Sequence, residues 1–147
     1  MKFFPRKFFK VKDDKKIIDC IKEAETQTSG EIRVHFQKKL KADIMDEAVK
    51  TFYSLKMDET KDSNGVLFFF VMKKKKFAII GDKGINDLVP DDFWENIKLE
   101  LTEDFKSGNK TEGICKAIKT AGLKLKEYFP YDAINDVNEL PDEISYS

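Results

Sequence analysis

The sequence predicts an α/β fold, a three-layer α/β/α sandwich in which helices cover both faces of a small mixed sheet of three to four strands. Residues 31–37 alternate between apolar and polar side chains, as a strand with two different faces does. Residues 66–72 are apolar on both faces, which is typical of a strand buried between two layers. Segments with a helical spacing of apolar residues precede, separate and follow these strands, and they supply the covering layers.

The first helix is predicted from Asp14 to about Gln27, where apolar residues recur at helical spacing. The Thr-Ser-Gly sequence at residues 28–30 then provides a turn before the strand at 31–37. Asp43 is suited to cap a second helix. The apolar face of that helix is formed by Ile44, Met45, Ala48, Val49, Phe52 and Leu55.

A hairpin and two further helices complete the predicted fold. Four lysines at 73–76 form a charged turn, and residues 77–80 form the return strand of the hairpin. Pro90 suits the first turn of a third helix, which Gly108 ends. A fourth helix begins near Thr111.

One domain is expected at residues 14–130, between two segments of opposite charge. Residues 1–13 form a basic, aromatic N-terminal segment, and residues 131–147 form an acidic tail without Lys or Arg. The chain as a whole is neutral, with 27 basic and 27 acidic side chains. A nucleic-acid-binding protein would carry a basic excess, so we expect no nucleic-acid partner.

The sequence contains neither a signal peptide nor an apolar run of the roughly 20 residues that span a bilayer. We therefore expect a cytoplasmic protein without membrane insertion. It is expected to be a monomer that binds a protein partner not yet identified. Cys20 and Cys115 fall on apolar helix faces without metal-like spacing, and we interpret them as small buried hydrophobic residues rather than a disulfide framework. His35 is the one histidine, and a partly covered, hydrogen-bonded role is favoured over that of a general base.

Several segments in order resemble the TPM domain, a family named after thylakoid-lumen, photosystem-repair and acetylcholine-receptor-modulator proteins. The resemblance covers residues 14–130 and implies an α/β/α fold. It also implies roles in the assembly or repair of membrane complexes, divalent-cation binding in some members and phosphatase activity in others. Family members usually carry a signal peptide and often a membrane helix or a low-complexity tail; this sequence shows neither pattern, so we expect a stand-alone domain. The matching segments are Thr28-Ser29-Gly30-Glu31-Ile32-Arg33-Val34, Ala48…Phe52…Leu55…Met57, Asn64-Gly65-Val66-Leu67-Phe68, Ile79-Ile80-Gly81-Asp82-Lys83-Gly84-Ile85 and Phe105…Gly108…Gly113.

The hairpin brings two acidic loops together, independently of any family. One loop immediately precedes the strand at 66–72, and the other immediately follows the strand at 77–80. The start of one hairpin strand and the end of the other lie at the same end of the sheet. If the strand at 31–37 runs parallel to the strand at 66–72, Glu31 begins at that end as well.

The oxygen-bearing residues of these loops predict a divalent-cation site. Two irregular loops suit calcium, which accepts roughly 6–8 oxygens, better than magnesium with its strict octahedron, and magnesium is the alternative. The carboxylates are numerous enough for two calcium ions. Asp91 and Asp92 also suit a helix start, and Asn64 and Asp82 also suit turns, so solvated acidic loops without metal are the competing interpretation. The candidate ligands are Asp58, Glu59, Asp62 and Asn64 from the first loop, and Asp82, Asn86, Asp87, Asp91 and Asp92 from the second.

The predicted function is divalent-cation binding, in which the metal orders two loops that otherwise repel each other and the ordered surface engages a protein partner. No residue stands out as a catalytic nucleophile. A metal-dependent phosphatase is the alternative, because a metal-activated water at the same carboxylates could hydrolyse a phosphomonoester. Lys83 lies in the second loop and is the candidate cation for such a reaction.

Overall fold

The computed structural model describes residues 11–132 and 144–147. Most of the basic N-terminal segment and most of the acidic tail therefore lie outside the described residues. None of the helices in the described part of the chain is long and apolar enough to cross a membrane. In chain order the elements are α1 (Val11–Glu25), β1 (Glu31–Phe36), α2 (Ile44–Ser54), η2 (Met57–Glu59), β2 (Gly65–Val71), η3 (Met72–Lys74), β3 (Lys76–Gly81), α3 (Lys83–Asn86), α4 (Phe93–Lys106), α5 (Lys110–Tyr128) and β4 (Ser145–Tyr146).

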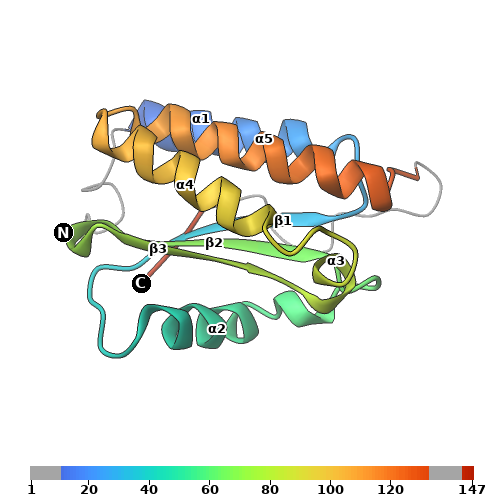
Figure 1. Ribbon diagram of the computed structural model, residues 1–147, viewed down its shortest axis with the longest axis horizontal. Coiled ribbons are helices and arrows are strands. Elements are labelled where there is room, and N and C mark those ends of the chain that lie inside the picture. The colour runs from blue at the N-terminus through green and yellow to red at the C-terminus, as the bar shows by residue number, and fades with distance from the viewer. Residues whose placement is uncertain (1–10, 133–143) are drawn as a thin grey trace.

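The helices lie in two layers on opposite faces of the sheet, which confirms the predicted α/β/α fold. Helices α1, α4 and α5 cover one face, and α2 covers the other (Figure 1). Successive side chains of β2 point to opposite faces of the sheet, so this one strand contributes apolar side chains to both layers. Its residues Val66, Phe68 and Phe70 join the apolar cluster beneath the three helices, whereas Leu67, Phe69 and Val71 join the cluster that contains Ala48 and Phe52 of α2.

The sheet is mixed, with the strand order β3-β2-β1-β4. Strand β1 runs parallel to β2 with Glu31 opposite Gly65, and helix α2 forms the crossover between them. Strand β3 is antiparallel to β2, with Val66 opposite Gly81. The predicted hairpin and the predicted parallel pairing are therefore both confirmed. Strands β1 and β2 begin at the end of the sheet where β3 finishes.

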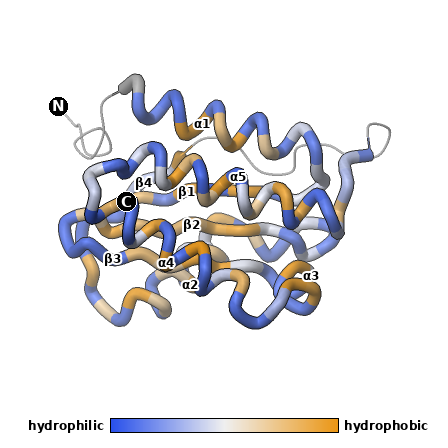
Figure 2. Tube along the Cα trace, turned by 45° about the horizontal axis from the view of Figure 1, so that its top comes forward, coloured by the Kyte–Doolittle hydropathy of each residue, from blue (hydrophilic) through white to orange (hydrophobic). Residues whose placement is uncertain are grey.

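The outer side of β1 is covered by side chains as well as by a strand. Strand β4 pairs with β1 in parallel, with Ser145 opposite His35. Further back along β1, the Ile32 amide donates to the Glu25 carboxylate at 2.6 Å. The Ser145 hydroxyl oxygen lies 3.4 Å from the Val34 carbonyl oxygen and covers it. Figure 2 shows the continuous apolar run of β2 beside the alternating hydropathy of the helices.

Two expectations about the second acidic loop were wrong. The loop contains a short helix, α3, because the Asp82 carboxylate accepts a hydrogen bond from the Lys83 amide at 2.8 Å and caps a helical turn there. Helix α4 begins at Phe93 rather than at Pro90, because the Pro90 carbonyl accepts the Phe93 amide at 3.0 Å and closes a turn first. Helix α1 spans Val11–Glu25 and so begins before Asp14 and ends before Gln27, whereas Asp43 caps α2 through the Met45 amide as predicted.

Candidate metal centre

The two acidic loops are in direct contact at what we call the acidic end of the sheet, formed by residues 58–65 and 81–92. The Asp82 amide donates to the Gly65 carbonyl at 2.9 Å, which ties the loops together at the strand ends. Gly84 of α3 lies against the first loop, since a Cβ atom there would be 2.2 Å from the Asp62 carbonyl oxygen and 2.4 Å from that of Ser63. Only glycine permits this approach.

Two buried oxygen atoms at the acidic end lack hydrogen-bond donors among the described residues. Asn64 is 1% exposed, and its Oδ1 atom is one of them. The Asn64 amide and side-chain nitrogen are engaged by Thr60 and Ser29, at 3.2 and 3.5 Å. The second atom is Oδ2 of Asp82, whose Oδ1 accepts from Lys83. Leaving a buried acceptor unsatisfied costs roughly 1–3 kcal/mol, so such atoms call for an explanation.

The other predicted ligands are either already hydrogen-bonded or exposed to solvent. Asn86 is already engaged, because its side-chain nitrogen donates to the Gly81 carbonyl and its oxygen accepts from the Trp94 indole, each at 2.7 Å. Within residues 11–132 and 144–147, no three His, Cys, Asp or Glu side chains form a group that could hold a metal ion. The remaining acidic candidates are solvent-exposed: Asp58 and Glu59 in η2, Asp62 in the first loop, and Asp87, Asp91 and Asp92 between α3 and α4.

Sequence reasoning did not name three groups of the acidic end as ligands: two backbone carbonyls and the Glu31 carboxylate. The carbonyl oxygens of Asp62 and Ser63 lie beside α3, because Ser63 adopts the left-handed conformation with φ of 51°. The side chain of Glu31 is buried, 4% exposed, at the first position of β1. The signal for Glu31 was present in the sequence, since a strand parallel to β2 places its first residue beside Gly65.

A second polar cluster lies at the opposite end of β1, which we call the histidine end and define by His35, Gln37, Ser145 and Ser147. The His35 ring is 4% exposed and stacks on Phe69 with centroids 5.5 Å apart. Its Nδ1 and Nε2 atoms lie 2.7 Å from the Ser145 and Ser147 hydroxyl oxygens, respectively. Burial and then the nearby Arg33 lower the pKa of His35 from 6.5 to about 4, so the ring is neutral at pH 7.

The hydrogen bonds of the histidine end assign a donor and an acceptor to each contact. The Gln37 side-chain nitrogen donates to the Glu47 carboxylate at 2.9 Å, so the Gln37 oxygen faces Ser147 and accepts from its hydroxyl at 3.1 Å. Ser147 has then used its hydrogen, and His35 Nε2 must donate to the serine oxygen. His35 Nδ1 in turn accepts from Ser145. Because Nε2 donates to Ser147, His35 cannot take the proton of that serine and does not activate it as a nucleophile. The groove beside this cluster, about 670 Å³, is lined by Lys38, Lys39, Lys41 and Lys50 among others.

Comparison with known proteins points to one family. Residues 5–123 match the family model described as TPM domain. The NMR structure of BA42 protein from the psychrophilic bacterium Bizionia argentinensis is 45% identical in sequence, covers 95% of this chain and 96% of its own, and has a TM-score of 0.88. The solution structure of the N-terminal domain of a P. gingivalis protein is 18% identical with a TM-score of 0.66, covers 82% of this chain and 78% of its own, and shares the fold. No curated protein matches.

Proposed function

The chain belongs to the TPM domain family, and we propose that it is a divalent-cation-binding domain that prefers calcium and whose acidic end is ordered by the bound ion. The observation that carries this proposal is the pair of buried oxygens without hydrogen-bond donors, Oδ1 of Asn64 and Oδ2 of Asp82. They come from the two loops that contact each other across Gly84. The proposed cation would supply the partner that each of these atoms lacks.

The candidate metal ligands at the acidic end favour a hard cation. They consist of oxygen atoms alone: the Asp82 carboxylate, the Asn64 amide oxygen and the carbonyl oxygens of Asp62 and Ser63. Oxygen ligands of mixed type on irregular loops suit calcium better than magnesium. Glu31 is a further carboxylate at the same end of the sheet. The exposed carboxylates are proposed to complete the shell, or to hold a second ion, once the loops close around the first; they are Asp58, Glu59, Asp62, Asp87, Asp91 and Asp92.

Binding would act as a switch on the surface of the domain. Without metal, carboxylates on two touching loops repel each other by roughly 1–4 kcal/mol for each close pair near a surface. A bound cation reverses the sign of this interaction and fixes the loops. We propose that the ordered surface then binds a protein partner, which makes the domain a metal-responsive interaction module.

The experiment is a calcium titration of full-length protein freed of metal with a chelator, followed by amide NMR with magnesium as the comparison ion. Shifts confined to residues 58–65 and 81–92, saturating in the micromolar range, are expected. Asp82→Asn should weaken binding by about tenfold or more, and the double variant Asp62→Ala/Asp87→Ala should abolish calcium-dependent stabilisation. Asp46→Asn, an exposed carboxylate on α2, is the matched control and should bind normally. Unchanged spectra at millimolar calcium would refute the proposal.

The same variants test the alternative, a metal-dependent phosphatase. The observation that favours it is the position of Lys83, an exposed cation directly after Asp82. Such a cation could stabilise charge on a transferring phosphoryl group. Calcium- or magnesium-dependent release of phosphate from an aryl phosphate, lost in both Asp82→Asn and Lys83→Gln, would establish hydrolysis. Calcium binding without turnover would favour the interaction module over the phosphatase.

A further inference from the structure

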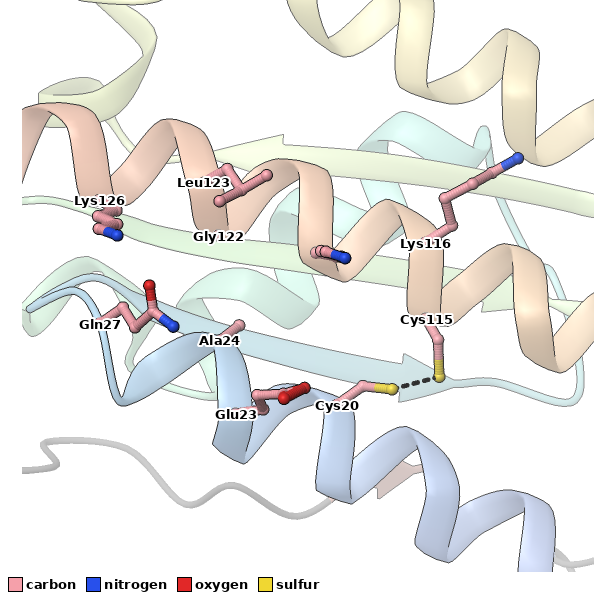
Figure 3. Close-up of a pocket in the computed structure, with 10 residues that line it drawn as sticks. Cys20, Glu23, Ala24, Gln27, Cys115, Lys116, Gly122, Leu123 and Lys126 are labelled. Carbon is pink, nitrogen blue, oxygen red and sulfur yellow. Dashed lines mark hydrogen bonds between the residues drawn. The ribbon is translucent and has the colours of Figure 1, made fainter.

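Cys20 of α1 and Cys115 of α5 face each other across the contact between the two helices. Their sulfur atoms are 2.6 Å apart, joined by a thiol hydrogen bond (Figure 3). This separation lies between that of a disulfide bond, about 2.05 Å, and that of an ordinary non-bonded contact. The prediction that both cysteines are buried was wrong, because each is only partly covered and both line a groove. Their approach comes from the close packing of α1 on α5, which periodicity within one helix cannot reveal.

The groove that exposes the two thiols has a positive lining. It encloses about 490 Å³ between α1 and α5, and its side chains include three lysines of α5, Lys116, Lys119 and Lys126, against the carboxylate of Glu23. Lys116 is paired with Asp104 at 3.1 Å. In the described part of the chain, neither Lys119 nor Lys126 has a carboxylate partner. The thiols therefore open into a groove that favours anionic molecules.

We propose that Cys20 and Cys115 form a redox-active dithiol, which an anionic low-molecular-weight disulfide such as glutathione disulfide oxidises to an internal disulfide joining α1 to α5. The sulfur atoms need to move by only about 0.5 Å to reach bonding distance. The groove gives the oxidant access to both sulfurs, and the lysines of α5 favour its negative charge.

The reaction proceeds in two exchanges. The Cys20 thiolate attacks one sulfur of the external disulfide, forms a mixed disulfide and releases the first thiolate. The Cys115 sulfur then attacks the Cys20 sulfur and expels the second. The two protein thiols lose two electrons and two protons, and the external disulfide gains them as two thiols, so the exchange is balanced. Reversal needs only an excess of the same thiol or a stronger dithiol.

The environment of Cys115 sets the order and the pace of these exchanges. Burial, and next the hydrogen bond with Cys20, raise the pKa of the Cys115 thiol from 9.0 to about 12. Its thiolate is scarce at neutral pH, and we therefore assign the first attack to Cys20. The second step is then slow, and its rate should rise with pH.

The disulfide would fasten α1 to the rest of the domain. Helix α1 packs chiefly on α5, with a smaller contact on β1, so it is held from one side (Figure 1). A bond between residues 20 and 115 closes a long loop and restricts the unfolded chain. The melting temperature of the oxidised protein should exceed that of the reduced protein by about 10 °C.

The first test incubates reduced full-length protein with glutathione disulfide, blocks remaining thiols by alkylation and measures intact mass and linked peptides. A monomer lighter by two hydrogen atoms, with Cys20 joined to Cys115 and reversed by dithiothreitol, is expected. The variants Cys20→Ser and Cys115→Ser are the matched controls. After treatment with glutathione disulfide, neither variant should form an internal disulfide or change its melting temperature. A wild-type protein that stays reduced, keeps stable glutathione adducts or forms only intermolecular dimers would overturn the proposal.

The second test examines the charge preference of the groove. Glutathione disulfide and the cationic disulfide cystamine are compared at equal concentration and pH. The ratio of the oxidation rate with glutathione disulfide to that with cystamine should be higher in wild type than in Lys119→Gln/Lys126→Gln. The same ratio should fall at high salt. Equal preference in wild type and variant would overturn the assignment of an anionic oxidant.

Discussion

The two ends of β1 hold polar clusters of opposite character. At the histidine end, the polar atoms of His35 and its neighbours have partners, and the network extends from β4 to Glu47 of α2. At the acidic end, buried oxygens of Asn64 and Asp82 lack donors in the described chain. The first cluster resembles a reactive site because it pairs serine with histidine, yet its hydrogen bonds are complete. The second has no catalytic pair, yet it has unfilled binding capacity.

This difference separates a structural cluster from a binding site. A satisfied buried network stabilises the fold and has little left to offer a ligand. An unsatisfied acceptor lowers the stability of the fold, and that stability is recovered when a ligand binds the acceptor. The residue types alone would suggest the reverse assignment here, since histidine and serine are common in active sites.

The largest expected effect is the response of the histidine end to acid. The pKa of His35 is about 4 in the folded protein and about 6.5 when unfolded, so the unfolded chain takes up the proton first as pH falls. The free energy of unfolding should therefore decrease by about 2 kcal/mol between about pH 7 and pH 5, and by about 3 kcal/mol by pH 4. Urea unfolding across this range measures the effect.

The control for this prediction is His35→Asn. Because the chain has one histidine, the variant should lose most of the pH dependence above pH 5, whatever its absolute stability. An identical slope in the wild type and the variant would show that another group is responsible.

The second effect concerns the contact between the acidic loops. Gly84→Ala places a Cβ atom against the carbonyl oxygens of Asp62 and Ser63. Those are backbone atoms, so the loops must separate, at a cost of about 2 kcal/mol in stability and with weaker calcium binding. Urea unfolding and the calcium titration measure both changes. Gly108→Asn is the matched control, because nothing lies within 4 Å of a Cβ there and Asn tolerates its positive φ. Equal losses in both variants would contradict the steric explanation.

The smallest expected effect is a difference in the free energy of unfolding between two variants of the metal-free protein, each of which changes one polar atom at one end of the sheet. Ser145→Ala removes the hydroxyl that donates to His35 Nδ1 and should destabilise the fold by about 1 kcal/mol. Asp82→Asn keeps the oxygen that caps α3 and removes only an acceptor without a donor, so the change should stay within about 0.5 kcal/mol. Urea unfolding of the two variants tests the contrast. A larger loss in Asp82→Asn would mean that Oδ2 has a structural role.

Much of the fold could be predicted because its signals are local. The unbroken apolar run of β2, the alternation in β1 and the aspartate that caps α2 each act within a few residues. The adjacency of the acidic loops also followed, since hairpin geometry fixes which strand ends meet. The pairing of β4 with β1 did not, because it joins residues about 110 positions apart through a two-residue strand.

The site could be predicted as a region but not as a set of atoms. The hairpin predicts that Asp62, Asp82 and Asp91 lie in loops that meet, but whether an oxygen is exposed, capped or without a hydrogen-bond donor depends on three-dimensional packing. Asn86 illustrates this point, since its amide is engaged by Trp94 from the next helix. The contact between Cys20 and Cys115 likewise depends on how α1 and α5 pack together.

The covering of the outer side of β1 has a consequence for self-association. A sheet grows by adding another chain wherever a strand offers a row of free amides and carbonyls. Along this side the Ile32 amide is held by Glu25, and the Phe36 carbonyl and Lys38 amide are held by the backbone of Ser147; the Ser145 side chain covers the Val34 carbonyl. A second molecule would have to displace a carboxylate and a strand together before it could pair there. The most apolar strands of the domain are thereby protected from fibril-like stacking on this side.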